Sequence, residues 1–372
     1  MRFCIITPNV IKGDGQGRAN YEVAREALRR GHELAIVASR IDPAIASAPR
    51  VESVTIATAR QPLQMLYDLE FRHRSAEWLR VHRRRFDVVM SNGAATSAPA
   101  DVTAAQFTHH GWWNNPFHIW RTAKTPYGLY QLLYTTMGRR MERAAFLSSR
   151  WSVAVSSQIK RELIEVGVPE GRIVVIYNGA DIDEFKPGRA ERAELGLPLG
   201  VPLFAFVGDL RLNRKNLGTV LKALVQVRDA HLAVAGDLRR SPYPAMAAEL
   251  AIDDRVHFLG KRLDIAAIMR SCDAFVFPSH YEGFCLSVVE AMASGLPVIV
   301  SRHVGTSEII TPECGIVLRH AADPNELAAA IRSLIDSPAL RREMGAAARC
   351  IATAHAWPVK AAQYLDFLEA VG

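Results

Sequence analysis

Short apolar runs alternate with longer segments of helical periodicity along most of the chain, and this alternation limits the folds that it can adopt. Phe3–Thr7 and Leu34–Val37 are two such runs. Between them, helical periodicity extends from about Arg18 to Arg30 and then meets Gly31, a residue that ends helices. Continuous apolar strands separated by helices are typical of a parallel sheet covered on both faces. We therefore predict an α/β fold.

The same alternation continues toward the C-terminus. Further strands are predicted at 87–90, 104–107, 151–155 and 172–176, after a long helix that Pro62 opens. The pattern restarts beyond a stretch of turn residues, with strands at 203–207, 231–235, 256–259, 274–277 and 298–300. We predict two doubly wound parallel-sheet units divided near residue 180, with ligands bound in a cleft at the carboxyl ends of the strands.

Composition and charge exclude several classes of protein. Hydrophobic residues make up 49% of the 372 residues and charged residues 22%, which excludes a disordered chain. No apolar run approaches the roughly 20 residues that span a bilayer, and the first strand begins too early for a signal peptide, so we expect a cytoplasmic protein. Five scattered cysteines favour neither disulfides nor a zinc site. The net charge of +7 suits phosphorylated substrates, anionic lipid or nucleic acid, but no nucleic-acid-binding motif accompanies it.

A glycine-rich loop follows the first predicted strand. Gly13, Gly15 and Gly17 precede a helix whose free amides can hold an anion. The last glycine of a dinucleotide fingerprint is missing, and Ser39 and Arg40 stand where a nicotinamide site needs an acid. The loop is therefore an anion contact or a plain strand–helix turn, rather than a dinucleotide site.

A cluster of cations follows the strand at 203–207. Arg211, Arg214 and Lys215 lie within five residues, just before a helix that starts near Leu217. An arginine fork and a lysine point charge suit a diphosphate. A solvated surface loop is the alternative.

The segment from Pro278 to Ile299 is the most informative one. Glu282 lies in the loop after a strand, and Gly283 lets the backbone approach a ligand closely. Glu290 lies about one turn inside the helix that follows, within reach of a ribose. The first amides of this helix can face phosphate and belong to Phe284, Cys285 and Leu286. Two glutamates eight residues apart can thus bracket a nucleotide sugar, whereas a loop residue and a helix-surface charge are the alternative.

These residues carry a family resemblance. Glu282-x7-Glu290, with Gly295-Leu296-Pro297-Val298 after it, resembles the Glu-x7-Glu signature of retaining GT-B glycosyltransferases and is most similar to glycosyltransferase family 4. Tyr177–Asp181 and Arg29–Leu34 resemble other segments of that family, so the resemblance covers essentially the whole chain.

The resemblance implies a fold and a reaction. It implies two Rossmann-like domains, with 1–179 binding the acceptor and 180–354 binding the nucleotide sugar, and a C-terminal helix at 355–372 that packs back on the first domain. It also implies transfer of a hexose from a UDP- or GDP-sugar with retention at the anomeric carbon, with no metal ion and no further cofactor.

The resemblance assigns roles to individual residues of the predicted donor site. Glu282 matches the glutamate near the donor sugar, Glu290 the ribose glutamate and Lys215 the diphosphate lysine. Asp209 stands where the family often has an arginine. The second cation must therefore come from elsewhere in the loop; we favour Arg211, with Arg214 as the alternative.

On the N-terminal side, Gly15 matches the second glycine of the family's Gly-Gly loop, and Asp14 replaces the first. The family has a histidine in contact with the donor sugar at the end of the strand at 104–108. His109 matches it better, and a slip of one residue would select His110; a structural histidine is the alternative. The side chains expected at the acceptor are His110, Trp112, Trp113 and Asn92, with core packing as the alternative for the aromatic rings.

Six arginines gather on one predicted helix, and basic plus apolar residues can seat a helix on anionic lipid headgroups. They are Arg72, Arg74, Arg80, Arg83, Arg84 and Arg85, and Trp78 and Leu79 lie among them. We predict binding to anionic vesicles, which would place the protein on the inner face of the plasma membrane. A solvated helix face is the alternative.

Together these observations predict a retaining, metal-independent glycosyltransferase. Its acceptor would be a glycan, a lipid-linked glycan or a small molecule, in cell-envelope polysaccharide or glycolipid synthesis by analogy. The alternative is a catalytically inactive GT-B protein with a binding or regulatory role, against which the intact set of Glu282, Glu290 and Lys215 argues.

Overall fold

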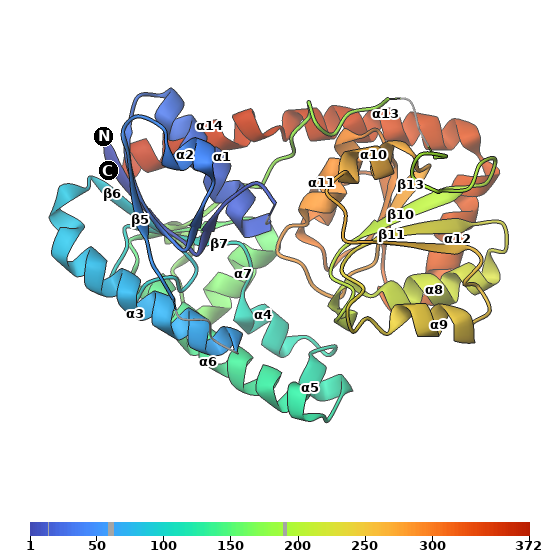
Figure 1. Cartoon of the computed structure of the whole chain (residues 1–372), viewed down its shortest axis with the longest axis horizontal. Helices are drawn as coiled ribbons and strands as arrows, with labels where there is room; N and C mark the ends of the chain where they lie inside the picture. Colours follow the sequence, from blue (N-terminus) through green and yellow to red (C-terminus); the bar gives the residue numbers. More distant parts are fainter. Residues whose placement is uncertain (14, 59–62, 189–191) are drawn as a thin grey trace. The chain divides into compact units, whose positions relative to one another are not determined.

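In a computed structural model, the chain forms two compact units, Met1–Asn178 with Trp357–Gly372, and Gly179–Ala356. It describes residues 1–13, 15–58, 63–188 and 192–372. Each unit is built on a parallel sheet flanked by helices (Figure 1). The predicted α/β fold of two doubly wound units is therefore confirmed, and the last helix belongs to the first unit.

The sheet of the first unit has the strand order β5-β3-β1-β6-β7-β8-β9, with all neighbours parallel. Its strands are β1 (Arg2–Ile6), β3 (Glu33–Ala38), β5 (Val51–Thr55), β6 (Val88–Asn92), β7 (Val102–Ala105), β8 (Trp151–Ala154) and β9 (Ile173–Val175). A short parallel pair, β2 (Asn9–Val10) and β4 (Arg40–Ile41), follows β1 and β3. Its helices are α1 (Gly15–Arg29), α2 (Pro43–Ala46), α3 (Gln64–His82), α4 (His109–Asn114), α5 (Ile119–Thr122), α6 (Pro126–Ser148), α7 (Ser157–Val166) and α14 (Trp357–Val371), with 3-10 turns η1 (Arg83–Arg85) and η2 (Glu170–Arg172).

The sheet of the second unit has the order β12-β11-β10-β13-β14-β15, again all parallel. Its strands are β10 (Leu203–Val207), β11 (His231–Ala235), β12 (Val256–Gly260), β13 (Ala274–Phe277), β14 (Val298–Ser301) and β15 (Gly315–Leu318). Its helices are α8 (Leu217–Gln226), α9 (Tyr243–Glu249), α10 (Ile265–Arg270), α11 (Leu286–Ala293), α12 (Pro324–Asp336) and α13 (Pro338–Ala354), with 3-10 turns η3 (Asn213–Lys215) and η4 (Gly305–Ile309).

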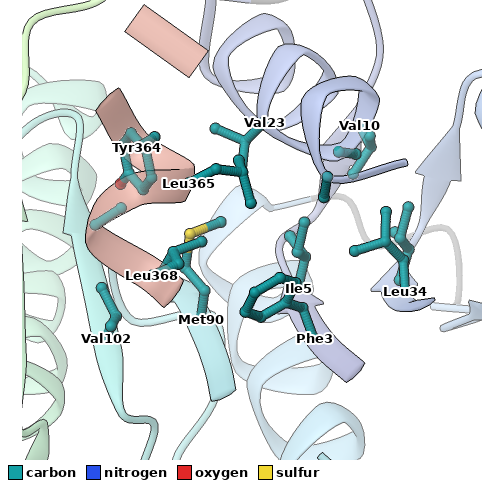
Figure 2. Close-up of a cluster of buried hydrophobic side chains, with 14 of the residues drawn as sticks. Phe3, Ile5, Val10, Val23, Leu34, Met90, Val102, Tyr364, Leu365 and Leu368 are labelled. Atoms are coloured by element: carbon teal, nitrogen blue, oxygen red, sulfur yellow. The ribbon is translucent and has the colours of Figure 1, made fainter. Parts of the chain in front are cut away.

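Alternate residues of β1 build the two cores of the first unit, because successive side chains of a strand point to opposite faces. Phe3 and Ile5 pack with side chains of α1 and α14, as Figure 2 shows. Cys4 and Ile6 pack on the other face, with side chains of α3. The apolar run at the start of the chain is therefore buried on both sides.

The last helix, α14, is attached to α1 by charge as well as by packing. Arg30 donates to the carboxylates of Asp366 at 2.8 Å and Glu369 at 2.9 Å, and to the carbonyl oxygen of Ala362. Hydrogen bonds to Glu26 on α1, and the two carboxylates of α14, raise the pKa of the Arg30 guanidinium. Arg30 thus joins the two helices.

The sequence prediction and the structure differ in informative places. The prediction omits β5, an edge strand whose residues are half-buried or exposed, so that no continuous apolar run marks it. It also omits α6, whose buried positions include Gly128, Thr135, Gly138 and Glu142 instead of an apolar stripe. The helix predicted to begin at Pro62 is α3; Pro62 itself lies outside the described residues. Among the helices of the described ranges, none is long and apolar enough to cross a membrane.

Replacing Arg30 by alanine should lower the free energy of unfolding of the first unit by about 1–3 kcal/mol, since it removes the hydrogen bonds that join Glu26 on α1 to Asp366 and Glu369 on α14. Arg29→Ala is the matched control, because Arg29 is largely exposed and pairs with Glu26 within its own helix. Urea unfolding followed by tryptophan fluorescence measures both. Equal effects of the two substitutions would contradict the attachment of α14 through Arg30.

Candidate functional site

In the second unit, the loops after β10 and β13 meet at the carboxyl edge of the sheet, where a buried asparagine joins them. Asn216 lies at the start of α8 in the left-handed conformation, with φ +60°. Its Nδ2 atom donates to the carbonyl oxygens of Pro278 at 2.9 Å and Ala321 at 2.6 Å. Its Oδ1 atom accepts from the Thr219 hydroxyl at 2.7 Å. This one side chain therefore sets the position of three segments of the site.

Lys215, the residue before Asn216, is half-buried and forms an ion pair with the buried Glu282. Arg214 lies on the same side of the carboxylate, with its Nε atom 3.9 Å from Glu282 Oε1. The backbone supports this arrangement, because the Arg214 carbonyl oxygen accepts from the Ser279 hydroxyl at 2.8 Å and the His280 amide at 2.9 Å. The structure thus brings three of the predicted site residues together.

Charge decides the protonation of Glu282. Burial alone would raise the pKa of its carboxyl, but the charges of Lys215 and Arg214 outweigh burial and hold the pKa below its ordinary value. Its backbone is also held, since the Glu282 amide donates to the His303 carbonyl oxygen and the Gly305 amide donates to that of Glu282, each at 3.0 Å. The site therefore presents an ionised carboxylate flanked by two cations.

The start of α11 has the features of an anion site. Its N-cap residue, Cys285, makes no side-chain capping hydrogen bond within the described residues. Leu286, Ser287 and Glu290 form the half-buried side of the helix, so that Glu290 lies one turn from the first amides. The expectation for Cys285 needs a correction: its amide donates to the Thr306 hydroxyl at 3.0 Å and is already occupied.

Arg211 and Arg214 have different surroundings. Arg211 bends back onto Asp209, with its amide and its Nε atom 2.9 and 3.0 Å from Asp209 Oδ1 and its Nη2 atom 2.7 Å from Oδ2. Arg214 instead lies beside Glu282. The sequence favours Arg211 as the second cation, whereas this geometry favours Arg214.

The sequence Gly-Asp-Leu-Arg occurs twice, after the neighbouring strands β10 and β11, and the turn of Arg239 onto Asp237 repeats that of Arg211 onto Asp209. The glycines allow the two strand ends to approach. A Cβ atom on Gly236 would lie 2.2 Å from the Gly208 carbonyl oxygen. Position 236, at this edge of the sheet, therefore accepts only glycine.

In the first unit, β7 ends at Ala105, and His109 begins α4 instead of ending the strand. Thr108 caps that helix by accepting from the Gly111 amide at 3.0 Å. Both the amide and the Nδ1 atom of His109 contact the buried carboxylate of Glu142, each at 2.7 Å. A Cβ atom on Gly138 would lie 2.5 Å from the His109 ring, so only glycine lets α6 approach this closely. His109 is therefore held in one orientation.

The other predicted residues of this region have more ordinary surroundings. His110 contacts Glu165, whose side chain is 60% exposed, at 3.1 Å. Trp112 is buried in the fold, as the core alternative for these rings predicts. Two guanidinium groups lie over the ring of Trp113: those of Arg121 and Arg139, 5.8 and 5.1 Å from the ring centre.

Asn92 ends β6 and is buried, and its Nδ2 atom has no hydrogen-bond partner in the described part of the chain. A buried donor of this kind is costly unless a ligand satisfies it.

Gly15 is the exposed first residue of α1, and Asp14 before it lies outside the described residues. Over those same described ranges, no group of three or more His, Cys, Asp or Glu side chains is placed to hold a metal ion.

Sequence reasoning missed three positioning residues: Asn216, Glu142 and Thr306. Each acts on a partner more than 20 residues away, so local spacing carries no signal for it. For Asn216 the sequence does contain a signal. It is an asparagine directly before a helix and next to a predicted ligand-binding lysine, and asparagine tolerates the left-handed conformation.

Family comparisons match both units. The profile of Glycosyltransferase Family 4 matches residues 13–184, and that of Glycosyl transferases group 1 matches residues 188–350. Curated relatives named D-inositol 3-phosphate glycosyltransferase include one from Corynebacterium kroppenstedtii, 34% identical over 216 residues, and one from Mycobacterium tuberculosis, 37% identical over 152 residues. These alignments cover 53% and 38% of this chain, and 48% and 32% of the relatives. The chain therefore spans about half or less of the length of these relatives.

Solved structures share the whole fold. Sucrose-phosphate synthase from Thermosynechococcus elongatus superimposes with a TM-score of 0.82 at 19% identity, over 100% of this chain and 99% of the other. Anabaena HepE, determined in complex with UDP-glucose, gives a TM-score of 0.75 at 20% identity over 100% of both chains. With its two matching profiles and this fold, the chain belongs to the GT-B glycosyltransferases of the family 4 type.

Proposed function

We propose that the chain is a retaining glycosyltransferase that moves a hexose from a nucleoside-diphosphate sugar to a hydroxyl group of an acceptor. The observation that carries this proposal is the cluster in which Lys215 and Arg214 flank Glu282, in the unit whose α11 begins without a side-chain cap among the described residues. Cations and helix amides are the groups that hold a diphosphate. We expect Glu290, one turn into α11, to bind the ribose.

The proposed reaction needs no side-chain base. The bond between the anomeric carbon and the diphosphate oxygen breaks, and a bond to the acceptor oxygen forms on the same face of the sugar. The acceptor proton passes to the departing diphosphate. Lys215 and Arg214 stabilise the charge that develops on the departing oxygen, and Glu282 orients the sugar and offsets positive charge at the anomeric carbon. We expect this step without a metal ion, with His109 as a further contact to the donor sugar.

The comparisons suggest which substrates to test first. UDP-glucose is the first donor, because the structure of Anabaena HepE contains it. Inositol phosphate is the first small acceptor, because the curated relatives carry its name. A place in cell-envelope polysaccharide or glycolipid synthesis is part of the proposal by analogy alone.

Binding and turnover together test the proposal. A ligand that binds only the folded state raises the melting temperature, so a panel of UDP, GDP and their sugars identifies the donor. Hydrolysis of that donor without acceptor is then measured, with and without a chelator. A catalytically inactive binding protein would bind the nucleotide sugar and leave it intact. Nuclear magnetic resonance of the product gives the anomeric configuration, and inversion would contradict the retaining reaction.

Lys215→Ala should reduce turnover about 100- to 1000-fold, the usual cost of losing one electrostatic contact to a transition state. Lys222→Ala is the control, because Lys222 is an exposed lysine on the neighbouring helix α8. Steady-state rates at saturating donor measure both, and thermal melting checks the fold. Near-normal turnover of the Lys215 variant would contradict its role at the diphosphate and indicate that the loop is only a solvated surface.

Glu290→Ala should weaken donor binding more than it slows transfer at saturating donor, since it removes hydrogen bonds to the ribose. The loss is on the order of 1–3 kcal/mol, or about 5- to 150-fold in the dissociation constant. Titration calorimetry with the nucleotide measures it, against Glu343→Ala, an exposed glutamate on α13. Unchanged nucleotide affinity would contradict the ribose role.

Glu142→Gln should lower turnover by up to about 100-fold while nucleotide affinity stays unchanged, because the carboxylate orients His109, and displacement of a group that positions the donor sugar costs rate. Glu165→Gln, which alters the partner of His110 instead, is the matched control. Rates and calorimetry are compared for both variants. A loss confined to the Glu165 variant would transfer the role from His109 to His110.

A further inference from the structure

The arginines that the sequence groups on one helix are largely engaged within the fold. Arg72 donates to the carbonyl oxygens of Ala94 and Thr96 at 2.9 and 2.8 Å, and Arg83 donates to Asp101 at 2.7 Å. Such partners are expected, because a cation that is partly removed from water needs hydrogen bonds to replace its hydration. Cations that are already paired offer little to an anionic ligand.

One half-buried arginine has no such partner. Arg139 lies on α6, and its guanidinium makes no hydrogen bond or ion pair with any residue that the structure describes. Every other arginine that is buried or half-buried in the described ranges contacts a carboxylate or a carbonyl group. A guanidinium left in this state is costly unless a ligand engages it.

Arg139 is held by an indole ring instead. Its guanidinium lies 5.1 Å from the ring centre of Trp113 on α4, and that of Arg121 on α5 lies 5.8 Å from the same centre. Both short helices pack on α6 (Figure 1). Arg121 also donates to the carbonyl oxygens of Trp113 and Asn115, which fixes it at the end of α4. We refer to Trp113, Arg121 and Arg139 as the Trp113 cluster.

His118 supports the cluster from the interior of the first unit. It is fully buried, and its ring centre lies 5.8 Å from that of Trp113. Its Nε2 atom lies 3.1 Å from the hydroxyl of Thr135, which is four residues before Arg139 and therefore on the same side of α6. Burial, with the charge of Arg121 as a smaller cause, lowers the pKa of His118 to about 4, so its ring is neutral at pH 7. The cluster is thus built on a buried support.

The surroundings of the cluster are poor in acid. From residue 113 to residue 143 the sequence has five cations and one acid, Glu142. The Glu142 carboxylate contacts the amide and the Nδ1 atom of His109, each at 2.7 Å. The local charge is therefore positive, and positive sites with low-dielectric walls concentrate anions.

The cluster adjoins the histidine that we expect at the donor sugar. His109 and Trp113 are four residues apart in α4, so they lie on the same side of that helix, about 5.4 Å apart along its axis. Gly138, the residue before Arg139, packs against His109, since a Cβ atom there would lie 2.5 Å from the histidine ring. An anion at the cluster therefore lies about one helical turn from the sugar contact, where an acceptor has to be for its hydroxyl to reach the anomeric carbon.

We propose that the Trp113 cluster binds a phosphate group of the acceptor, so that the acceptor is a phosphate monoester of a sugar or polyol. The planar fork of Arg139 holds two phosphate oxygens, and Arg121 supplies a second positive charge. Two guanidinium groups match the double charge of a phosphate monoester better than the single charge of a carboxylate. This assignment rests on the proposed function and adds the chemical class of the acceptor to it.

Nuclear magnetic resonance of the full chain tests the phosphate site without turnover. The indole N–H resonance of Trp113 is identified with Trp113→Phe, and inorganic phosphate should shift it until the site is saturated. Arg139→Gln should weaken this binding about tenfold or more, and Arg139→Lys, which keeps the charge and loses the fork, should restore part of it. The matched control is Arg140→Gln, an exposed neighbour on α6, which should leave the affinity unchanged.

Steady-state kinetics then assign the bound phosphate to the acceptor. Inositol phosphate and inositol form a matched pair of acceptors that differ only in the phosphate. Arg139→Gln should raise the KM for inositol phosphate about tenfold or more, while kcat and the KM for the donor stay nearly unchanged. The KM for inositol should not respond to the substitution.

Several outcomes would overturn the proposal. A Trp113 resonance that phosphate does not move would do so, as would a phosphate affinity that survives Arg139→Gln. Tighter binding of acetate than of phosphate would contradict the choice of a phosphate, and a rise in the donor KM alone would assign the cluster to the donor. Thermal melting verifies that each variant is folded. A chain that shows the phosphate response and transfers no sugar would contradict the proposed function and leave the phosphate site in place.

Discussion

The carboxyl edge of the second sheet depends on one buried amide, that of Asn216. Its donor atom serves two carbonyl groups from separate loops, and its oxygen serves Thr219 in the helix that it opens. Loss of these partners would leave buried carbonyls unsatisfied, at a cost of about 1–3 kcal/mol for each group. The left-handed turn at Asn216 also determines where Lys215 emerges. Backbone geometry therefore determines the position of Lys215 more than charge does.

The pairing of Lys215 with Glu282 is better explained by ligand binding than by stability. Taking two charges out of water costs nearly as much as their attraction returns, so buried ion pairs are weak stabilisers. The same pair holds both side chains in place and keeps the carboxylate ionised, with Arg214 as a second cation. A diphosphate that engages the two cations would leave Glu282 available to the sugar. These charges thus preorganise the proposed donor site, and donor binding would change their pairing.

Buried strands and the donor segment could be predicted from the sequence, because their signals are local. The strands at 203–207 and 274–277 are continuous apolar runs, and the strand at 231–235 is apolar after His231; the observed bounds of all three agree with the predicted ones. Edge strand β5 has no such run. The choice between Arg211 and Arg214 is not local either. It depends on a turn by which Arg211 reaches Asp209, and on the distance from Arg214 to Glu282 in the loop after β13. Three-dimensional proximity of this kind has no counterpart in residue spacing.

The same distinction applies to charge. A run of arginines in a sequence predicts a basic surface only if no acidic side chains or carbonyl groups of the fold pair with them. In this fold, neighbouring strands and loops supply such partners, as Asp101 does for Arg83. The region of α6 presents the opposite case. Its arginines remain exposed because Glu142, the acid nearest to them in the sequence, faces inward to hold His109. The Glu142 carboxylate thereby orients His109 and leaves the outer side of α6 positive. The contact that holds the histidine inside the first unit therefore also determines the charge on the surface of that unit.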